Sequence, residues 1–130
     1  MKNKYQNSGI NISTEDNLED YLSNLDKVDT SVVNDSSISF VLEVYNKKFL
    51  FLGDVVIKKN DECNILQRLT EEYRENRTFD LIKIPHHGSS YNISKDFIDL
   101  FDSLEYIFST NSKYGLPDID VLANLIYRRG

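Results

Sequence analysis

The hydrophobic pattern changes its period at residue 37, and this change limits the folds open to the chain. Between 37 and 45 one set of alternating residues is Ile38, Phe40, Leu42 and Val44, which is apolar throughout. Such alternation is typical of a β-strand, because successive side chains point to opposite faces. After a polar turn expected at 46–48, residues 49–52 are all apolar. We therefore expect an antiparallel hairpin whose second strand is buried on both faces, with layers above and below the sheet.

Four other segments carry apolar residues at helical spacing. We expect helices over 14–28 and 61–76, a third helix capped by Ser94, and a last one with Pro117 in its first turn. The residues expected to face inward from these four helices are Leu18, Tyr21, Leu22, Leu25 and Val28; Ile65, Leu66, Leu69 and Tyr73; Phe97, Ile98, Phe101 and Leu104; and Ile119, Leu122, Leu125 and Ile126.

Two further strands are expected at 79–84 and 106–109, which completes the order helix, strand, strand, helix, strand, helix, strand, helix. This order predicts a layered α/β fold, a mixed sheet with flanking helices. Residues 1–12 are polar and Asn-rich, and we expect them to be a loose leader. The domain division expected is 1–33 for leader and first helix, and 34–130 for the layered unit.

Composition excludes several classes of protein. The 130 residues include 21 acidic and 15 basic side chains, and a net charge of −6 argues against charge-driven binding to nucleic acid or anionic lipid. The longest apolar run is 49–52, far short of the roughly 20 residues that a membrane helix needs. The N-terminus has no apolar stretch after its lysines, so no secretory signal is expected. A single cysteine, Cys63, suits a reducing compartment, and we expect a cytoplasmic protein.

Gly53-Asp54 directly follows the second expected strand, and polar groups at strand ends are where α/β proteins build their sites. A carboxylate here borders the core, where an unpaired charge is costly. Asp54 is interpreted either as a turn residue, the commoner role of Gly-Asp, or as a metal-bridging carboxylate.

The only two histidines, His86 and His87, are adjacent at the end of the third strand. Neutral imidazole is a common zinc ligand, and neighbouring histidines can divide roles between metal and substrate. Gly88 lets the backbone approach a ligand closely, and Ser89 and Ser90 can donate to an anion. A polar loop with two exposed histidines is an equal alternative.

Taken in order, these pieces resemble the second half of a metallo-β-lactamase-fold hydrolase. The similarity is to the branch that includes the DNA-uptake protein ComEC and phosphorylcholine-esterase-like enzymes, and it covers about residues 34–128. The strings that carry it are Asn34-Asp35-Ser36-Ser37-Ile38, Phe49-Leu50-Phe51-Leu52-Gly53-Asp54, Leu81-Ile82-Lys83-Ile84-Pro85-His86-His87-Gly88-Ser89-Ser90, Ile107-Phe108-Ser109-Thr110-Asn111 and Tyr114-Gly115-Leu116-Pro117-Asp118.

The resemblance implies a sandwich of two β-sheets with outer helices and a two-metal site of zinc or manganese at one edge. By the resemblance, Asp54 bridges the metals, His87 ligates one of them, and His86 faces a phosphoester substrate near Ser89 and Ser90. A metal-bound water is a strong nucleophile near neutral pH, which agrees with this chemistry.

Two departures from the family pattern change the expectation for this chain. The first-half motif His-x-His-x-Asp-His is absent, and Leu116 stands where the family usually has a histidine before the proline. We therefore expect the C-terminal half of a phosphoester hydrolase that is inactive in isolation. The alternative is a degenerate, non-catalytic binding or oligomerisation module. Under either interpretation, the expected partner of the chain is a second copy of itself or a missing N-terminal half.

Overall fold

The computed structural model describes residues 37–58, 65–111 and 113–129. The strands are β1 (Phe40–Val44), β2 (Lys47–Phe51), β3 (Thr78–Lys83) and β4 (Asp102–Ile107). The helices are α2 (Ile65–Glu72), α3 (Lys95–Leu100) and α4 (Ile119–Arg129), with a short 3₁₀ turn, η2, at Pro85–Gly88. Over these residues the predicted order is confirmed, and the fold is α/β. The expected leader, the helix over 14–28 and Cys63 lie outside the described residues.

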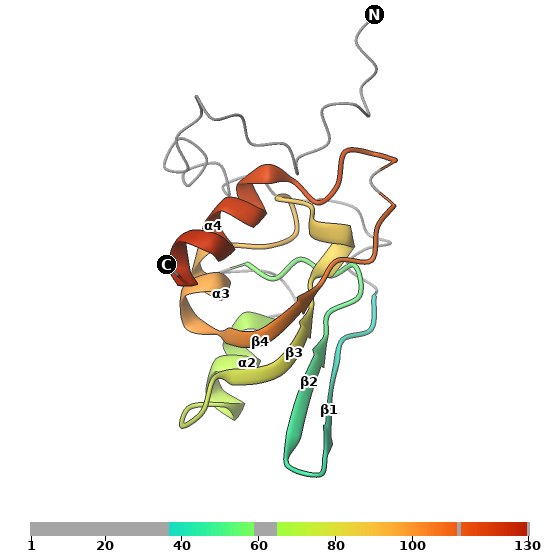
Figure 1. The fold of residues 1–130 in the computed structure, drawn as a ribbon. Coiled ribbons are helices and arrows are strands. Elements are labelled where there is room, and N and C mark those ends of the chain that lie inside the picture. The colour runs from blue at the N-terminus through green and yellow to red at the C-terminus, as the bar shows by residue number, and fades with distance from the viewer. Residues whose placement is uncertain (1–36, 59–64, 112, 130) are drawn as a thin grey trace, which may run out of the picture.

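The four strands form one mixed sheet in the order β1-β2-β3-β4 (Figure 1). β1 and β2 are an antiparallel hairpin, whereas β2, β3 and β4 are parallel and are connected through α2 and α3. The hairpin turn is made by Tyr45 and Asn46, whose φ angles of 50° and 62° are those of a two-residue type I′ turn. The prediction of a turn at 46–48 is wrong, because Lys47 and Lys48 already pair with β1.

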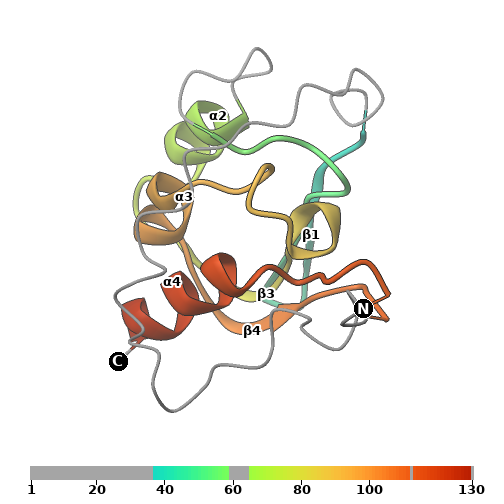
Figure 2. The same cartoon turned by 90° about the horizontal axis from the view of Figure 1, so that it is seen from above.

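The hydrophobic core lies on one face of this sheet, which we call the core face. Leu50 of β2 and Ile82 of β3 point into it and are 1% and 0% exposed. Side chains of α2, α3 and α4 join the same cluster, and Figure 2 shows these helices on one side of the sheet. The buried cluster consists of Leu50, Leu52, Val55, Ile57, Leu66, Phe79, Ile82, Ile84, Ile93, Phe97, Ile98, Phe101, Val121 and Leu125.

The opposite face of the sheet, which we call the open face, carries the residues that alternate with those of the core face. Strand register places them together, since Phe40 pairs with Phe51 and Phe49 pairs with Leu81. The aromatic rings of Phe40 and Phe51 stack with their centroids 4.9 Å apart. The open face consists of Phe40, Leu42, Val44, Lys47, Phe49, Phe51, Leu81, Lys83, Glu105 and Ile107.

Within the described residues, no helix covers the open face. Phe40, Leu42 and Ile107 are 53%, 48% and 42% exposed, and Phe49 and Phe51 are half-buried. The prediction that the second strand is buried on both sides is therefore wrong for this part of the chain. The described fold has two layers, a sheet and one layer of helices.

The boundary between α3 and β4 differs from the prediction. Ser94 caps α3 as predicted, because its side chain accepts a hydrogen bond from the Phe97 N–H. The helix then ends at Leu100, and Phe101 is extended with φ −117° and ψ 143°. Leu104 was expected inside the helix stripe but lies in β4 and is 62% exposed. Parallel pairing with β3 begins at Asp102, which is why the strand starts earlier than the predicted 106–109.

The last helix also starts and faces differently from the prediction. Pro117 precedes α4 by two residues and is not in its first turn. Asp118 directly precedes the helix, and its carbonyl accepts from the Val121 N–H in the first turn at 3.1 Å. Ile126, expected to face inward, is 54% exposed, whereas Val121 is fully buried.

Candidate functional site

Residues from three neighbouring strands meet where the parallel strands end. The loop after β2 contains Gly53 and Asp54, the loop after β3 contains the two histidines, and Ser109 follows β4. The His86 N–H donates to the Gly53 carbonyl at 2.9 Å, which joins the first two loops. Carboxyl ends of parallel strands meet at one edge of a sheet, and this edge is the usual place for an α/β site.

His86 is oriented by a residue that sequence reasoning missed. Its Nδ1 lies 2.9 Å from Asn92 Oδ1, and the Asn92 Nδ2 donates to the Asp54 carbonyl at 3.1 Å. Asn92 is completely buried, so this bridge ties the Asp54 loop to the histidine loop from inside the protein. An amide oxygen only accepts, so Nδ1 carries the proton of the neutral ring and Nε2 is the acceptor nitrogen. No pattern in the sequence singles out Asn92.

His87 turns toward the end of β4 instead. Its Nδ1 contacts the backbone carbonyl of Ser109 and lies 3.2 Å from the Ser109 Oγ. The carbonyl accepts, so Nδ1 is again protonated and Nε2 is the acceptor nitrogen of the neutral ring. The two imidazole rings lie 5.8 Å apart at 65°.

Both histidines adopt left-handed backbone conformations, with φ of 43° at His86 and 58° at His87. A residue with a side chain pays about 1–3 kcal/mol for such a backbone, and the surrounding structure must enforce it. Here the His86 carbonyl accepts from the Ser89 N–H, and the Gly88 carbonyl accepts from the Asp118 N–H at 2.9 Å. Strain of this kind clusters at functional sites, which makes this turn a candidate for one.

Gly88 allows the C-terminal loop to approach this turn. Its φ is +90°, and a Cβ there would lie 2.5 Å from Pro117 Cβ and 2.8 Å from a ring carbon of Phe108. Only glycine fits such a close contact. Leu116 precedes this proline, and its carbonyl accepts from Thr110 Oγ1 at 3.2 Å.

Ser89 and Ser90, predicted to face substrate, are 6% and 2% exposed. The Ser90 N–H donates to Asp118 Oδ2 at 2.7 Å, and the Ser89 Oγ accepts from the Tyr91 N–H. The buried Lys58 donates to the Ser90 carbonyl at 3.2 Å. Both serines thus hold the loop together in this conformation, and their contact with substrate stays a prediction.

Asp54 is half-buried, and its N–H donates to Ser37 Oγ at 2.9 Å. No hydrogen bond or ion pair to its carboxylate is found in the described part of the chain. Among the described residues, however, no three His, Cys, Asp or Glu side chains gather closely enough to hold a metal ion. The roles of Asp54 and His87 as metal ligands, and of His86 as a substrate contact, stay predictions.

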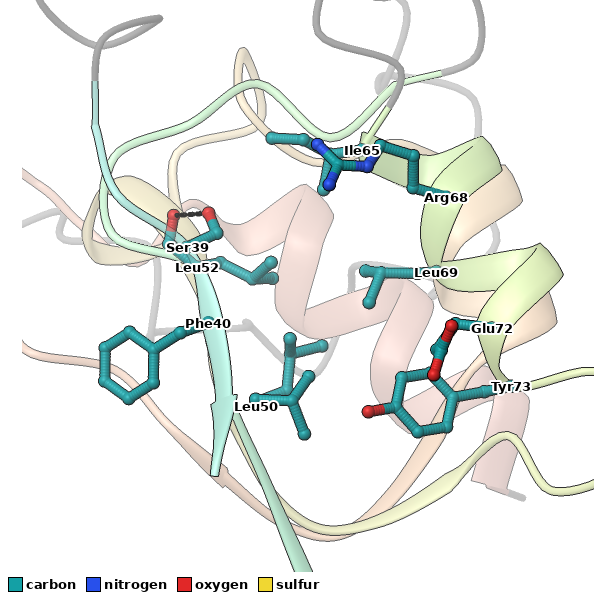
Figure 3. A pocket seen from close by; sticks show the side chains of 10 residues that line it. Ser39, Phe40, Leu50, Leu52, Ile65, Arg68, Leu69, Glu72 and Tyr73 are labelled. Carbon is teal, nitrogen blue, oxygen red and sulfur yellow. Dashed lines mark hydrogen bonds between the residues drawn. The ribbon is translucent and has the colours of Figure 1, made fainter. Parts of the chain in front are cut away.

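A separate cleft of about 380 Å³ lies between the hairpin and α2 (Figure 3). Leu50, Leu52 and Leu69 point into it, whereas the ring of Phe40 points away. Its lining residues are Ser39, Phe40, Val41, Leu50, Leu52, Ile65, Arg68, Leu69, Glu72 and Tyr73. None of the predicted site residues lines it.

The tyrosine at the rim of this cleft is held by a neighbouring carboxylate. The Tyr73 hydroxyl donates to Glu43 Oε1 at 3.0 Å. Burial, followed by the hydrogen bond to Glu43, raises the pKa of Tyr73 to about 12. The Tyr73 hydroxyl is therefore protonated at physiological pH, and it donates its hydrogen bond to Glu43 of the same chain.

Comparisons of the chain with protein-family models, curated proteins and solved structures found no match.

Proposed function

We propose that the edge formed by Asp54, His86 and His87 is part of a phosphoester-hydrolase site of the metallo-β-lactamase type. One observation carries the proposal: each histidine has its Nδ1 held by an oxygen, from Asn92 and Ser109 respectively, on a left-handed turn at the sheet edge. Oxygen partners of this kind orient an imidazole so that its Nε2 faces a metal or a substrate.

In this proposal the chain supplies an incomplete site. A two-metal hydrolase uses roughly four to six protein ligands, and the chain offers three candidates. In the family the metal supplies an activated water as nucleophile. Asp54 and His87 alone are fewer ligands than a two-metal site needs, so no step through a metal is assigned to this chain. With its ring doubly protonated, His86 would donate from Nε2 to a phosphate oxygen. Asp54 and His87 would complete a ligand set that residues from elsewhere supply.

A second candidate function is a degenerate binding module without catalysis. It is favoured by Leu116, since an alkyl side chain can neither ligate a metal nor bind a phosphate oxygen. The backbone around it contacts the histidine turn through Pro117. The two candidates differ in whether Asp54 and His87 bind a metal at all.

The test measures Mn²⁺ and Zn²⁺ binding to the full chain by calorimetry, together with turnover of a generic phosphodiester. We expect weak metal binding that is lost in Asp54→Asn and His87→Gln, and no turnover. Asp96→Asn is the matched control, because Asp96 is an exposed carboxylate on α3. Metal binding that these site variants leave unchanged would contradict the hydrolase proposal and favour the binding module. Phosphodiester turnover that Asp54→Asn abolishes would instead show that this chain holds a complete catalytic site.

We also place the protein in the cytoplasm as part of this proposal, on the support of its single cysteine. Among the described residues, no helix has both the length and the apolar character needed to cross a membrane. Nucleic acid as a substrate stays open, although the net charge of −6 does not favour it.

A further inference from the structure

The open face is an apolar surface on a fold that has only one covering layer. Four strands contribute to it. One row across the strands runs Phe40, Phe51, Lys83 and Ile107, and the next runs Leu42, Phe49, Leu81 and Glu105, so each row is apolar except for one charged residue. Contiguous apolar surfaces of this kind mark interaction sites on soluble proteins.

Two opposite charges lie at one side of this face. Lys83 of β3 is paired in register with Ile107, and Glu105 of β4 is paired with Leu81. They are therefore diagonal neighbours on adjacent strands. Neither side chain makes a hydrogen bond or ion pair within the described residues. Lys47 also lies on this face but already pairs with Asp80 at 3.2 Å, so Lys83 and Glu105 are the cation and the anion that remain for a partner on the described part of the face.

A two-fold axis converts this arrangement into a complementary one. In a symmetric dimer the same patch serves both partners, so a contact from residue i to residue j occurs twice. Stacked sheets lie about 10 Å apart, a gap that lysine and glutamate side chains can span together. We place the two-fold axis between the two sheets, perpendicular to the strands and level with the gap between the Lys83 row and the Glu105 row. Rotation about this axis brings each Lys83 close to the Glu105 of the other copy.

We infer that the open face is a self-association surface on which two copies pack face to face, with Lys83 of each copy paired to Glu105 of its partner. Phe49, Phe51 and Leu42 form the apolar part of the interface on β1 and β2, and the two ion pairs lie beside it on β3 and β4 and set the register. A neutral, apolar face does not suit a polyanion or a lipid surface. This inference does not rest on the proposed phosphoester chemistry.

The first experiment measures the mass of the full chain by analytical ultracentrifugation from about 1 to 100 µM, a range that covers micromolar dissociation constants. We expect a dimer that Leu42→Asp converts to a monomer with an unchanged circular dichroism spectrum. Ile126→Asp is the matched control, because Ile126 is similarly exposed but lies on α4. A wild-type monomer over the whole range overturns the inference, as does a dimer that survives Leu42→Asp.

The second experiment tests the reciprocal pairing by charge exchange. Lys83→Glu and Glu105→Lys each place like charges together twice, and we expect each to weaken the dimer about tenfold or more. The double variant restores both pairs and should associate like the wild type. A mixture of the two single variants should form a heterodimer, because each then meets the opposite charge. If the double variant is as weak as the singles and the mixture does not associate, the proposed pairing is wrong.

Discussion

The core face and the open face belong to the same strands, and both are apolar, yet only one is buried. In β3 the neighbours Leu81 and Ile82 differ by one position in the chain, and Ile82 is completely buried while Leu81 is half-buried. The cause is the placement of α2, α3 and α4, which all join the core-face cluster. Apolar alternation therefore identifies two sets of side chains but does not tell which set the rest of the chain covers.

The largest expected effect compares two alanine substitutions on the same strand. Ile82→Ala should lower the free energy of unfolding by about 3 kcal/mol, because it leaves a cavity in a closed core. Leu81→Ala should cost about 1 kcal/mol or less when measured at a protein concentration low enough to avoid association. The free energy of unfolding of each variant is measured by urea denaturation. Equal losses would mean that the open face is covered within a single chain.

A smaller effect is expected at the turn where the strand-end loops meet. Gly88→Ala combines a positive φ with clashes against Pro117 and Phe108, and we expect it to lower the free energy of unfolding by about 3 kcal/mol or somewhat less. Gly115 has a φ of +73° but no atom within 4 Å of a built Cβ. Gly115→Ala should therefore cost only about 1 kcal/mol. The free energies of unfolding of Gly88→Ala and Gly115→Ala, measured by thermal and urea unfolding, separate the cost of the steric clash from the cost of the positive φ.

The helix layer contributes a third, modest effect. Ser94→Ala removes the hydrogen bond to the Phe97 N–H at the start of α3 and the one to the Ile57 carbonyl at 3.0 Å. We expect a loss of about 1 kcal/mol in the free energy of unfolding. Lys95→Ala, at an exposed position of the same turn, is the control and should be nearly neutral. A neutral Ser94→Ala would show that the cap does not stabilise the layer.

The smallest effect is a pH dependence at the amino end of β3. The Lys48 N–H donates to Asp80 Oδ2 at 2.8 Å, and this bond, followed by the interaction with Lys47, lowers the pKa of Asp80 below its ordinary value of 3.8. A lowered carboxyl pKa stabilises the fold above pH 3.8, and the contribution is lost as the pH falls through the folded pKa. Asp80→Asn should therefore be less stable at pH 7, with a difference that shrinks below pH 4. Melting temperatures across this range make the test, and a constant difference would contradict it.

The order of strands and helices in the described part of the chain was predictable because it depends on local signals. Alternation predicts β1, a Ser followed by a helical stripe predicts the cap at Ser94, and Leu66 and Leu69 face the core as their spacing indicates. The strand-end positions of Asp54 and of the histidines also followed, since a polar residue after an apolar strand must lie at an edge.

What the sequence determined by itself is the set of elements and the residues that end each strand, because hydrophobic period and capping act over a few residues. The tertiary structure decided which face of the sheet is covered, where β4 begins, and that Asn92 links Asp54 to His86. It also forced His86 and His87 into left-handed backbones, against their local preference. These features arise from contacts between segments far apart in the chain, and such contacts leave no periodic pattern in the sequence.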